Sequence, residues 1–126
     1  MRPLWPSSNL YNYMITIDAT HKSLGRVASD AAKILLGKHK ATFVKHQVIG
    51  EEVKIVNAGK IRVTGAKAQD KKYVRYSGYP GGQKIENYSM LTARLGNAEA
   101  IRRAVLGMLP KNRLQTKRIK LLTIEK

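Results

Sequence analysis

The sequence SLGRVASDAAKILLG, residues 23–37, has a helical pattern in which one face must be buried. Apolar residues recur every three or four positions from Leu24 to Leu36, the spacing of one face of an α-helix. Ser23 is a residue type favoured at the N-cap, and Gly37 suits the left-handed position that ends a helix. The pattern therefore predicts a helix over residues 24–36 with one buried face.

Runs of β-branched and apolar residues on both sides of this helix predict strands. They cover residues 13–19, 53–57, 61–64 and 121–124. Only three residues separate the second run from the third, a spacing that favours an antiparallel pair. Residues 38–46 carry three lysines and two histidines without a regular period, so we interpret them as an exposed basic loop.

Two further strand-like runs, residues 73–76 and 84–88, flank the glycine-rich sequence SGYPGG of residues 77–82. This arrangement predicts a β-hairpin with a glycine-rich tip. A polar, helix-tolerant segment precedes the hairpin, and helices are predicted over residues 89–95 and from Asn97 to the residue before Pro110.

The predicted organisation is one α/β domain over residues 13–126, preceded by an irregular arm over residues 1–12. Apolar residues make up 43% of the chain and charged residues 25%, which supports a folded core rather than a disordered basic tail. The sequence lacks a run of about 18 to 20 apolar residues that would cross a bilayer, so we expect a soluble protein. The absence of cysteine excludes disulfides and thiolate metal sites.

The charge balance indicates a polyanionic partner. The chain has 24 Lys and Arg against 8 Asp and Glu, a formal net charge of +16. Self-repulsion of this size favours binding to a polyanion that neutralises it. A nucleic acid is the leading interpretation because Lys and Arg gain affinity by releasing counterions from phosphates, and an anionic membrane surface is the alternative. We expect no membrane partner, because no amphipathic helix of the sequence pairs a basic face with a large exposed apolar face.

Three segments contain the residues that we predict to contact RNA. The loop contributes Lys38, His39, Lys40, Lys45 and His46; the hairpin contributes Lys72, Arg75, Tyr76, Tyr79, Gly81, Gly82 and Lys84; and the C-terminal stretch contributes Lys111, Arg113, Lys117, Arg118 and Lys120. Cations would neutralise phosphates, glycines would admit a close phosphate, and tyrosines would stack on bases or cover a ribose. The alternatives are a solvated charged face and a mechanical turn whose tyrosines pack on the body.

Catalytic and metal sites are not predicted. His21, His39 and His46 lack the further ligands that a zinc site needs. The adjacent Glu51 and Glu52 would point to opposite sides of a strand, so they cannot act as an acid and base pair. The glycine-rich tip lacks the strand-to-helix context of a nucleotide-binding loop. We therefore expect no enzyme activity, no metal, no cofactor and no small-molecule substrate.

Six sequence motifs in a fixed order identify a family. They are Leu24-Gly25-Arg26, Gly37-Lys38-His39-Lys40, Val56-Asn57-Ala58, Thr64-Gly65, Ser77-Gly78-Tyr79-Pro80-Gly81-Gly82 and Gly107-Met108-Leu109-Pro110-Lys111-Asn112. From about Tyr13 to Ile124 the chain resembles the bacterial-type ribosomal protein L-thirteen family of the large subunit.

This resemblance implies a three-layer α/β/α domain with a small four-stranded, mostly parallel or mixed sheet, a protruding β-hairpin and basic loops. It implies binding to large-subunit rRNA early in assembly, beside neighbouring ribosomal proteins, in cytoplasmic ribosomes or, as the less favoured option, organellar ones. The family's RNA-facing positions would correspond here to Lys38, His39, Lys40, the tip around Tyr79 to Gly82, Lys111, Asn112 and Arg113. The alternative function is a free-standing RNA-binding regulator or RNA chaperone.

Overall fold

The central sheet is parallel and has three strands. The computed structural model describes residues 14–126, and the predicted arm over residues 1–12 lies outside them. Strand β2 (Val53–Val56) lies between β1 (Ile15–Asp18) and β5 (Leu122–Ile124), and both pairings are parallel. The register places Ile17 opposite Ile55, so apolar side chains gather on one face of the sheet.

The predicted antiparallel pair of residues 53–57 and 61–64 is wrong. Asn57 adopts a left-handed conformation with φ of 58°, and a short 3₁₀ helix, η1 (Ala58–Lys60), then carries the chain out of the sheet. Arg62 instead pairs with Ser23 through an isolated parallel bridge. Both edges of β2 are already occupied by β1 and β5, so residues 61–64 have no strand beside which they could form a hairpin.

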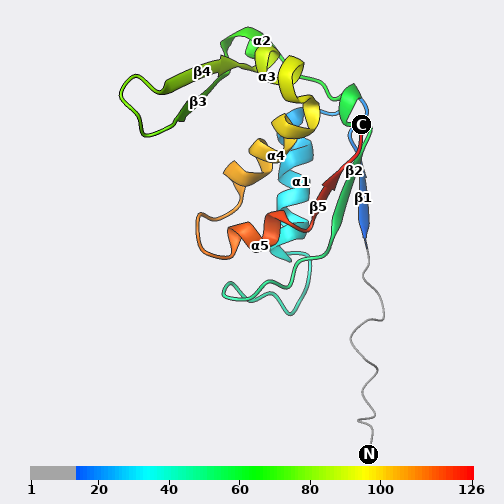
Figure 1. Ribbon diagram of the computed structural model, residues 1–126. Helices are drawn as coiled ribbons and strands as arrows, with labels where there is room; N and C mark the ends of the chain where they lie inside the picture. The colour runs from blue at the N-terminus through cyan, green and yellow to red at the C-terminus, as the bar shows by residue number, and fades with distance from the viewer. Residues whose placement is uncertain (1–13) are drawn as a thin grey trace, which may run out of the picture.

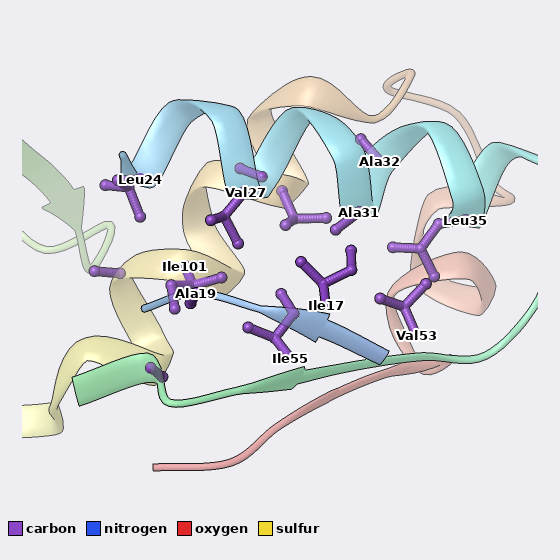
Figure 2. Packing of buried hydrophobic residues seen from close by; sticks show 14 of the residues in the cluster. Ile17, Ala19, Leu24, Val27, Ala31, Ala32, Leu35, Val53, Ile55 and Ile101 are labelled. Carbon is purple, nitrogen blue, oxygen red and sulfur yellow. The ribbon is translucent and has the colours of Figure 1, made fainter. Parts of the chain in front are cut away.

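Helix α1 (Leu24–Leu36) spans the predicted residues, and its buried face covers the apolar face of the sheet. Figure 2 shows Val27, Ala31 and Leu35 pointing toward the strand residues Ile17, Val53 and Ile55. The helix ends at Gly37, which has φ of 81° and donates its amide to the carbonyl oxygen of Ile34 at 3.0 Å. At the other end the Ser23 side chain makes no capping hydrogen bond, although its backbone has the extended N-cap conformation.

The remaining long helices lie on the same side of the sheet as α1. Helix α3 (Tyr88–Leu95) leads into α4 (Asn97–Met108), which buries Ile101 and Val105 and packs against α1. Figure 2 shows Ile101 of α4 beside Ala19, which follows β1. The α/β class is confirmed, but the described residues contain a three-stranded sheet with helices on one face, rather than the four strands and three layers expected.

The predicted hairpin is present and extends away from the body (Figure 1). Strand β3 (Lys72–Tyr76) pairs antiparallel with β4 (Gln83–Asn87), and Val74 lies opposite Ile85. A single helical turn, α2 (Lys67–Asp70), precedes it. The C-terminal basic stretch includes another short helix, α5 (Gln115–Ile119), before β5.

Candidate nucleic-acid interface

The basic loop leaves the C-terminal end of α1 and is held at its root by Glu51. The Lys40 ammonium group lies 3.2 Å from Glu51 Oε1 and donates to the carbonyl oxygen of Ile49 at 3.1 Å. His39 Nε2 lies 3.4 Å from Glu51 Oε2. The ammonium group of Lys40 is therefore already bonded within the protein, whereas Lys38, Lys45 and His46 are exposed. The outer part of the loop is therefore the part free to meet a ligand.

The C-terminal stretch folds beside this loop. Lys111, Asn112 and Arg113 are exposed on a tight turn in which Asn112 Oδ1 accepts from the Leu114 amide at 3.0 Å. Lys45, His46, Asn112, Arg113 and Leu114 line a shared hollow of about 290 Å³. The structure thus brings together two predicted segments that lie about 65 residues apart in the sequence. We call Lys45, His46, Lys111, Asn112 and Arg113 the two-loop surface.

Arg118 lies beneath the two-loop surface and does not belong to it. Its side chain is only 1% exposed, and its Nη2 atom donates to the carbonyl oxygens of Lys45 at 3.2 Å and Gln47 at 3.4 Å. A guanidinium buried in this way cannot reach a phosphate, so burial removes Arg118 from the predicted contacts. Lys117 and Lys120, on either side of it, are exposed.

The hairpin has two chemically different faces because successive side chains of a strand point to opposite sides. One face carries Arg75 and Lys84, which are paired across the strands. The other carries Val74, Tyr76 and Ile85, which are 59%, 65% and 56% exposed. The predicted hairpin residues are therefore divided between a cationic face and an apolar face.

Glu86 partly neutralises the cationic face of the hairpin. Its carboxylate accepts a 2.8 Å hydrogen bond from Arg94 and lies 3.8 Å from Arg75. The Arg94 hydrogen bond is the main reason that the pKa of Glu86 is lowered. Lys84 makes no ion pair with any described residue, so it is the cation on this face that is free for a phosphate.

The hairpin tip presents Tyr79 on a tight turn. The Gly82 amide donates to the carbonyl oxygen of Tyr79 at 2.9 Å, with Pro80 and Gly81 between them and φ of 72° at Gly81. This is the residue order that a type II turn demands. A Cβ on Gly82 would overlap the Ser77 hydroxyl and stand 3.0 Å from the carbonyl oxygen of Tyr79, so the turn favours glycine at this position. Tyr79 is 78% exposed and free to stack.

A large cationic cleft near the start of α1 was almost entirely missed by sequence reasoning. It has a volume of about 1180 Å³ and lies between the first turn of α1, residues 62–64, the base of the hairpin and the end of α4. Its cations are Lys22, Arg26, Arg62, Lys67, Lys71, Lys72 and Arg103. Only Lys72 was predicted, because the others occur singly or in pairs along the sequence and form no charge run.

The segments do not converge on one surface. The basic loop of the two-loop surface follows the C-terminal end of α1, whereas the hairpin lies near the other end (Figure 1). Leu24, Gly25 and Arg26 at that other end line the cleft. Over residues 14–126, no group of three or more His, Asp or Glu residues is placed to hold a metal ion. No helix among these residues is long and apolar enough to cross a membrane.

Comparisons with known proteins identify the family. The chain is 48% identical over 108 residues to the large ribosomal subunit protein uL13 of Moorella thermoacetica, covering 86% of this chain and 74% of that relative. It is 52% identical over 109 residues to the protein of the same name from Natranaerobius thermophilus, covering 86% and 76%. The corresponding protein of Herminiimonas arsenicoxydans is 51% identical over 108 residues, covering 86% and 75%. A family model described as Ribosomal protein L13 matches residues 12–124, nearly the whole described domain, and the chain therefore belongs to this family.

Proposed function

We propose that the chain is a structural constituent of the large ribosomal subunit that binds and stabilises large-subunit rRNA early in assembly. The observation that carries this proposal is the two-loop surface, where cations from two distant segments meet around one hollow. None of these cations pairs with a carboxylate of the described residues, so their charge is available to RNA phosphates. Family membership supports the ribosomal setting.

The mechanism is electrostatic clamping of folded RNA, with no chemical reaction. Lys38, Lys45, Lys111, Arg113, Lys117 and Lys120 neutralise phosphates, while His39, His46 and Asn112 donate hydrogen bonds to phosphate or ribose oxygens. Lys40 contributes less to this neutralisation, because its ammonium group is already paired with the Glu51 carboxylate. Because α1 and the sheet form one packed core, the loops keep a fixed geometry and resist rearrangement of the bound RNA.

The hairpin makes a separate contact in this proposal. Lys72, Arg75 and Lys84 meet phosphates, and Tyr76 and Tyr79 stack on unpaired bases or pack on ribose. Gly81 lets its backbone approach the RNA closely, while Gly82 acts by maintaining the turn. Neighbouring ribosomal proteins of the large subunit complete the set of partners, and the site of action is the ribosome in the cytoplasm.

Sedimentation tests this function directly. A tagged copy of the full chain, produced in a bacterium, is expected to sediment with the large subunit and to stay there after a wash in moderate salt. A matched variant with Lys45, Lys111 and Arg113 changed to Ala should be depleted from the subunits. Recovery of the unchanged chain only in the soluble fraction, still bound to RNA, would contradict the ribosomal role and favour a free-standing RNA-binding regulator.

A further inference from the structure

The cleft at the start of α1 gathers Lys and Arg side chains from several parts of the chain. Seven Lys and Arg side chains line it, and Asp30 is the only carboxylate among its lining residues. The seven cations come from the start of α1, from residue 62, from the α2–β3 segment and from α4. Tertiary folding therefore assembles a cationic concavity from segments that the sequence separates by up to 80 residues.

This charge is not neutralised within the described chain. Lys22, Arg26, Arg62, Lys67, Lys71 and Lys72 make no ion pair with a described residue and are all exposed. Arg103 is the exception, because its Nε atom lies 3.0 Å from Glu99 Oε1. A cleft lined by one sign of charge focuses the electrostatic potential and attracts ions of the opposite sign. The ligand that fits is an extended polyanion.

Two glycines line this cleft, so the helix surfaces at these positions carry no side chain. Gly25 lies in the first turn of α1 and Gly107 in the last turn of α4, and neither has any atom within 4 Å of the place where a Cβ would stand. Neither needs a left-handed backbone, and glycine destabilises a helix relative to alanine. The fold would thus accept alanine at both positions. What the glycines provide is space for another molecule's backbone to approach both helices.

The form of the cleft favours an RNA backbone over a small ligand or a stacked base. Its volume of about 1180 Å³ exceeds the roughly 300–1,000 Å³ of small-molecule sites. Tyr73 is the only Phe, Tyr or Trp among its lining residues, which also include His21, and Lys71 and Arg103 each lie 5.5 Å from the centre of the Tyr73 ring. The Tyr73 ring is therefore occupied by the protein's own cations, and the seven Lys and Arg side chains of the cleft favour phosphates as the groups to be recognised.

We propose that this cleft binds the sugar–phosphate backbone of a second rRNA segment, separate from the segment at the two-loop surface. This inference rests on the proposed function. Leu24, Gly25 and Arg26 at one end of α1 line the cleft, and the basic loop follows the other end at Leu36. A helix of 13 residues is about 20 Å long. Helix α1 therefore acts as a rigid spacer that holds two RNA backbones about that far apart.

The first experiment compares two triple variants that lose the same net charge. The cleft variant changes Arg26, Arg62 and Lys67 to Ala. The control variant changes Lys33, Lys60 and Arg102 to Ala, because these residues are exposed and do not line the cleft. The probe is purified bacterial large-subunit rRNA, titrated by filter binding at several salt concentrations. The cleft variant should bind about 10- to 100-fold more weakly, with a salt slope shallower by about 2 to 3, and the control should change less than about threefold.

The second experiment separates binding from folding. Gly25→Ala should raise the thermal midpoint of the full chain and yet weaken rRNA binding, because the added methyl group favours the helix but obstructs the cleft. Gly59→Ala is the matched control, since Gly59 also has open space around it and does not line the cleft. A variant that gains stability while losing affinity cannot be explained by misfolding.

Three results would overturn the proposal in distinguishable ways. If the cleft variant and its control keep the same affinity and salt slope while the variant with Lys45, Lys111 and Arg113 changed to Ala loses binding, the cleft is not an RNA site and the proposed function stands. If the cleft variant binds rRNA normally but is lost from large subunits, the cleft receives a protein neighbour. If the unchanged chain itself fails to bind rRNA, the proposed function fails as well.

Discussion

The Nη2 atom of Arg118 lies 3.2 Å from the carbonyl oxygen of Lys45, and this hydrogen bond joins the two basic segments of the chain. The same atom reaches the carbonyl oxygen of Gln47 at 3.4 Å. Arg118 comes from α5, whereas Lys45 lies in the loop after α1. The buried Arg118 guanidinium thus holds the backbone of the basic loop beside the C-terminal segment, where the exposed cations of the two-loop surface lie.

Replacing Arg118 with Ala should destabilise the protein. The change leaves the carbonyl oxygens of Lys45 and Gln47 without their hydrogen-bond donor. It also leaves a cavity, because the Arg118 side chain that is removed is only 1% exposed. Hydrogen bonds to charged groups contribute roughly 1.5–3 kcal/mol, so the free energy of unfolding should fall by about this amount in urea denaturation. Lys117→Ala, at the exposed neighbouring position, should change it by no more than about 0.5 kcal/mol. Equal effects of the two changes would contradict the role given to Arg118.

Reversing the charge of Lys111, Arg113 and Lys117 to Glu should weaken rRNA binding and flatten its salt dependence. Each lost phosphate contact reduces the salt slope by about 1. Filter binding of the full chain to large-subunit rRNA between 50 and 300 mM salt measures both quantities. The control reverses Lys33, Lys60 and Arg102, which carry equal charge outside the two-loop surface, the hairpin and the cleft. If both variants show the same decrease, net charge alone explains binding and the two-loop surface has no special role.

Tyr79→Ala should lower rRNA affinity without lowering stability. The ring is 78% exposed, so removing it costs the fold little. Stacking of a base on an aromatic side chain contributes about 1–3 kcal/mol, equivalent to about 5- to 150-fold in Kd. Tyr79→Phe keeps the ring and should bind nearly as well as the unchanged chain. Weak binding by both variants would point to the hydroxyl group instead of stacking.

Changing Gly50 to Ala should destabilise the fold strongly. A Cβ at this position would overlap the carbonyl group of Leu35, which belongs to the backbone of α1 and cannot turn aside. Overpacking of this kind typically costs about 1–3 kcal/mol, measurable as a lower urea midpoint. Gly59→Ala has no nearby atom and should be nearly neutral. An unchanged midpoint for Gly50→Ala would show that the loop can move away from α1.

Asp18 should make stability depend on pH in acid. Hydrogen bonds from Thr20, and a further one from Asn57 at 3.1 Å, lower the pKa of Asp18 from 3.8 to about 2. A lowered folded-state pKa means that the stabilisation is present above about pH 4 and is lost as the pH falls toward 2. The difference in thermal midpoint between the unchanged chain and Asp18→Asn should therefore shrink between pH 4 and pH 2. A difference that stays constant over this range would contradict the assignment.

Local sequence was sufficient for the elements whose contacts lie close together in the chain. The period of apolar residues from Leu24 to Leu36 predicts α1, and the sequence around Pro80 and Gly81 predicts the hairpin turn. The excess of Lys and Arg likewise indicates a polyanionic partner without any structure. Helices and tight turns are formed by contacts between residues a few positions apart, so a short stretch of sequence is enough to predict them.

The pairing of β2, the burial of Arg118 and the cationic cleft were decided by the tertiary structure. Residues 61–64 have strand-like composition, but β1 and β5 already occupy both edges of β2. Arg118 resembles its exposed neighbours in the sequence, and only packing against the Lys45 loop buries it. The cleft gathers cations such as Arg26, Arg62 and Lys71 that no local pattern connects. Sequence alone therefore determined the charge and the local elements, whereas long-range packing decided which charges are buried and which meet on one surface.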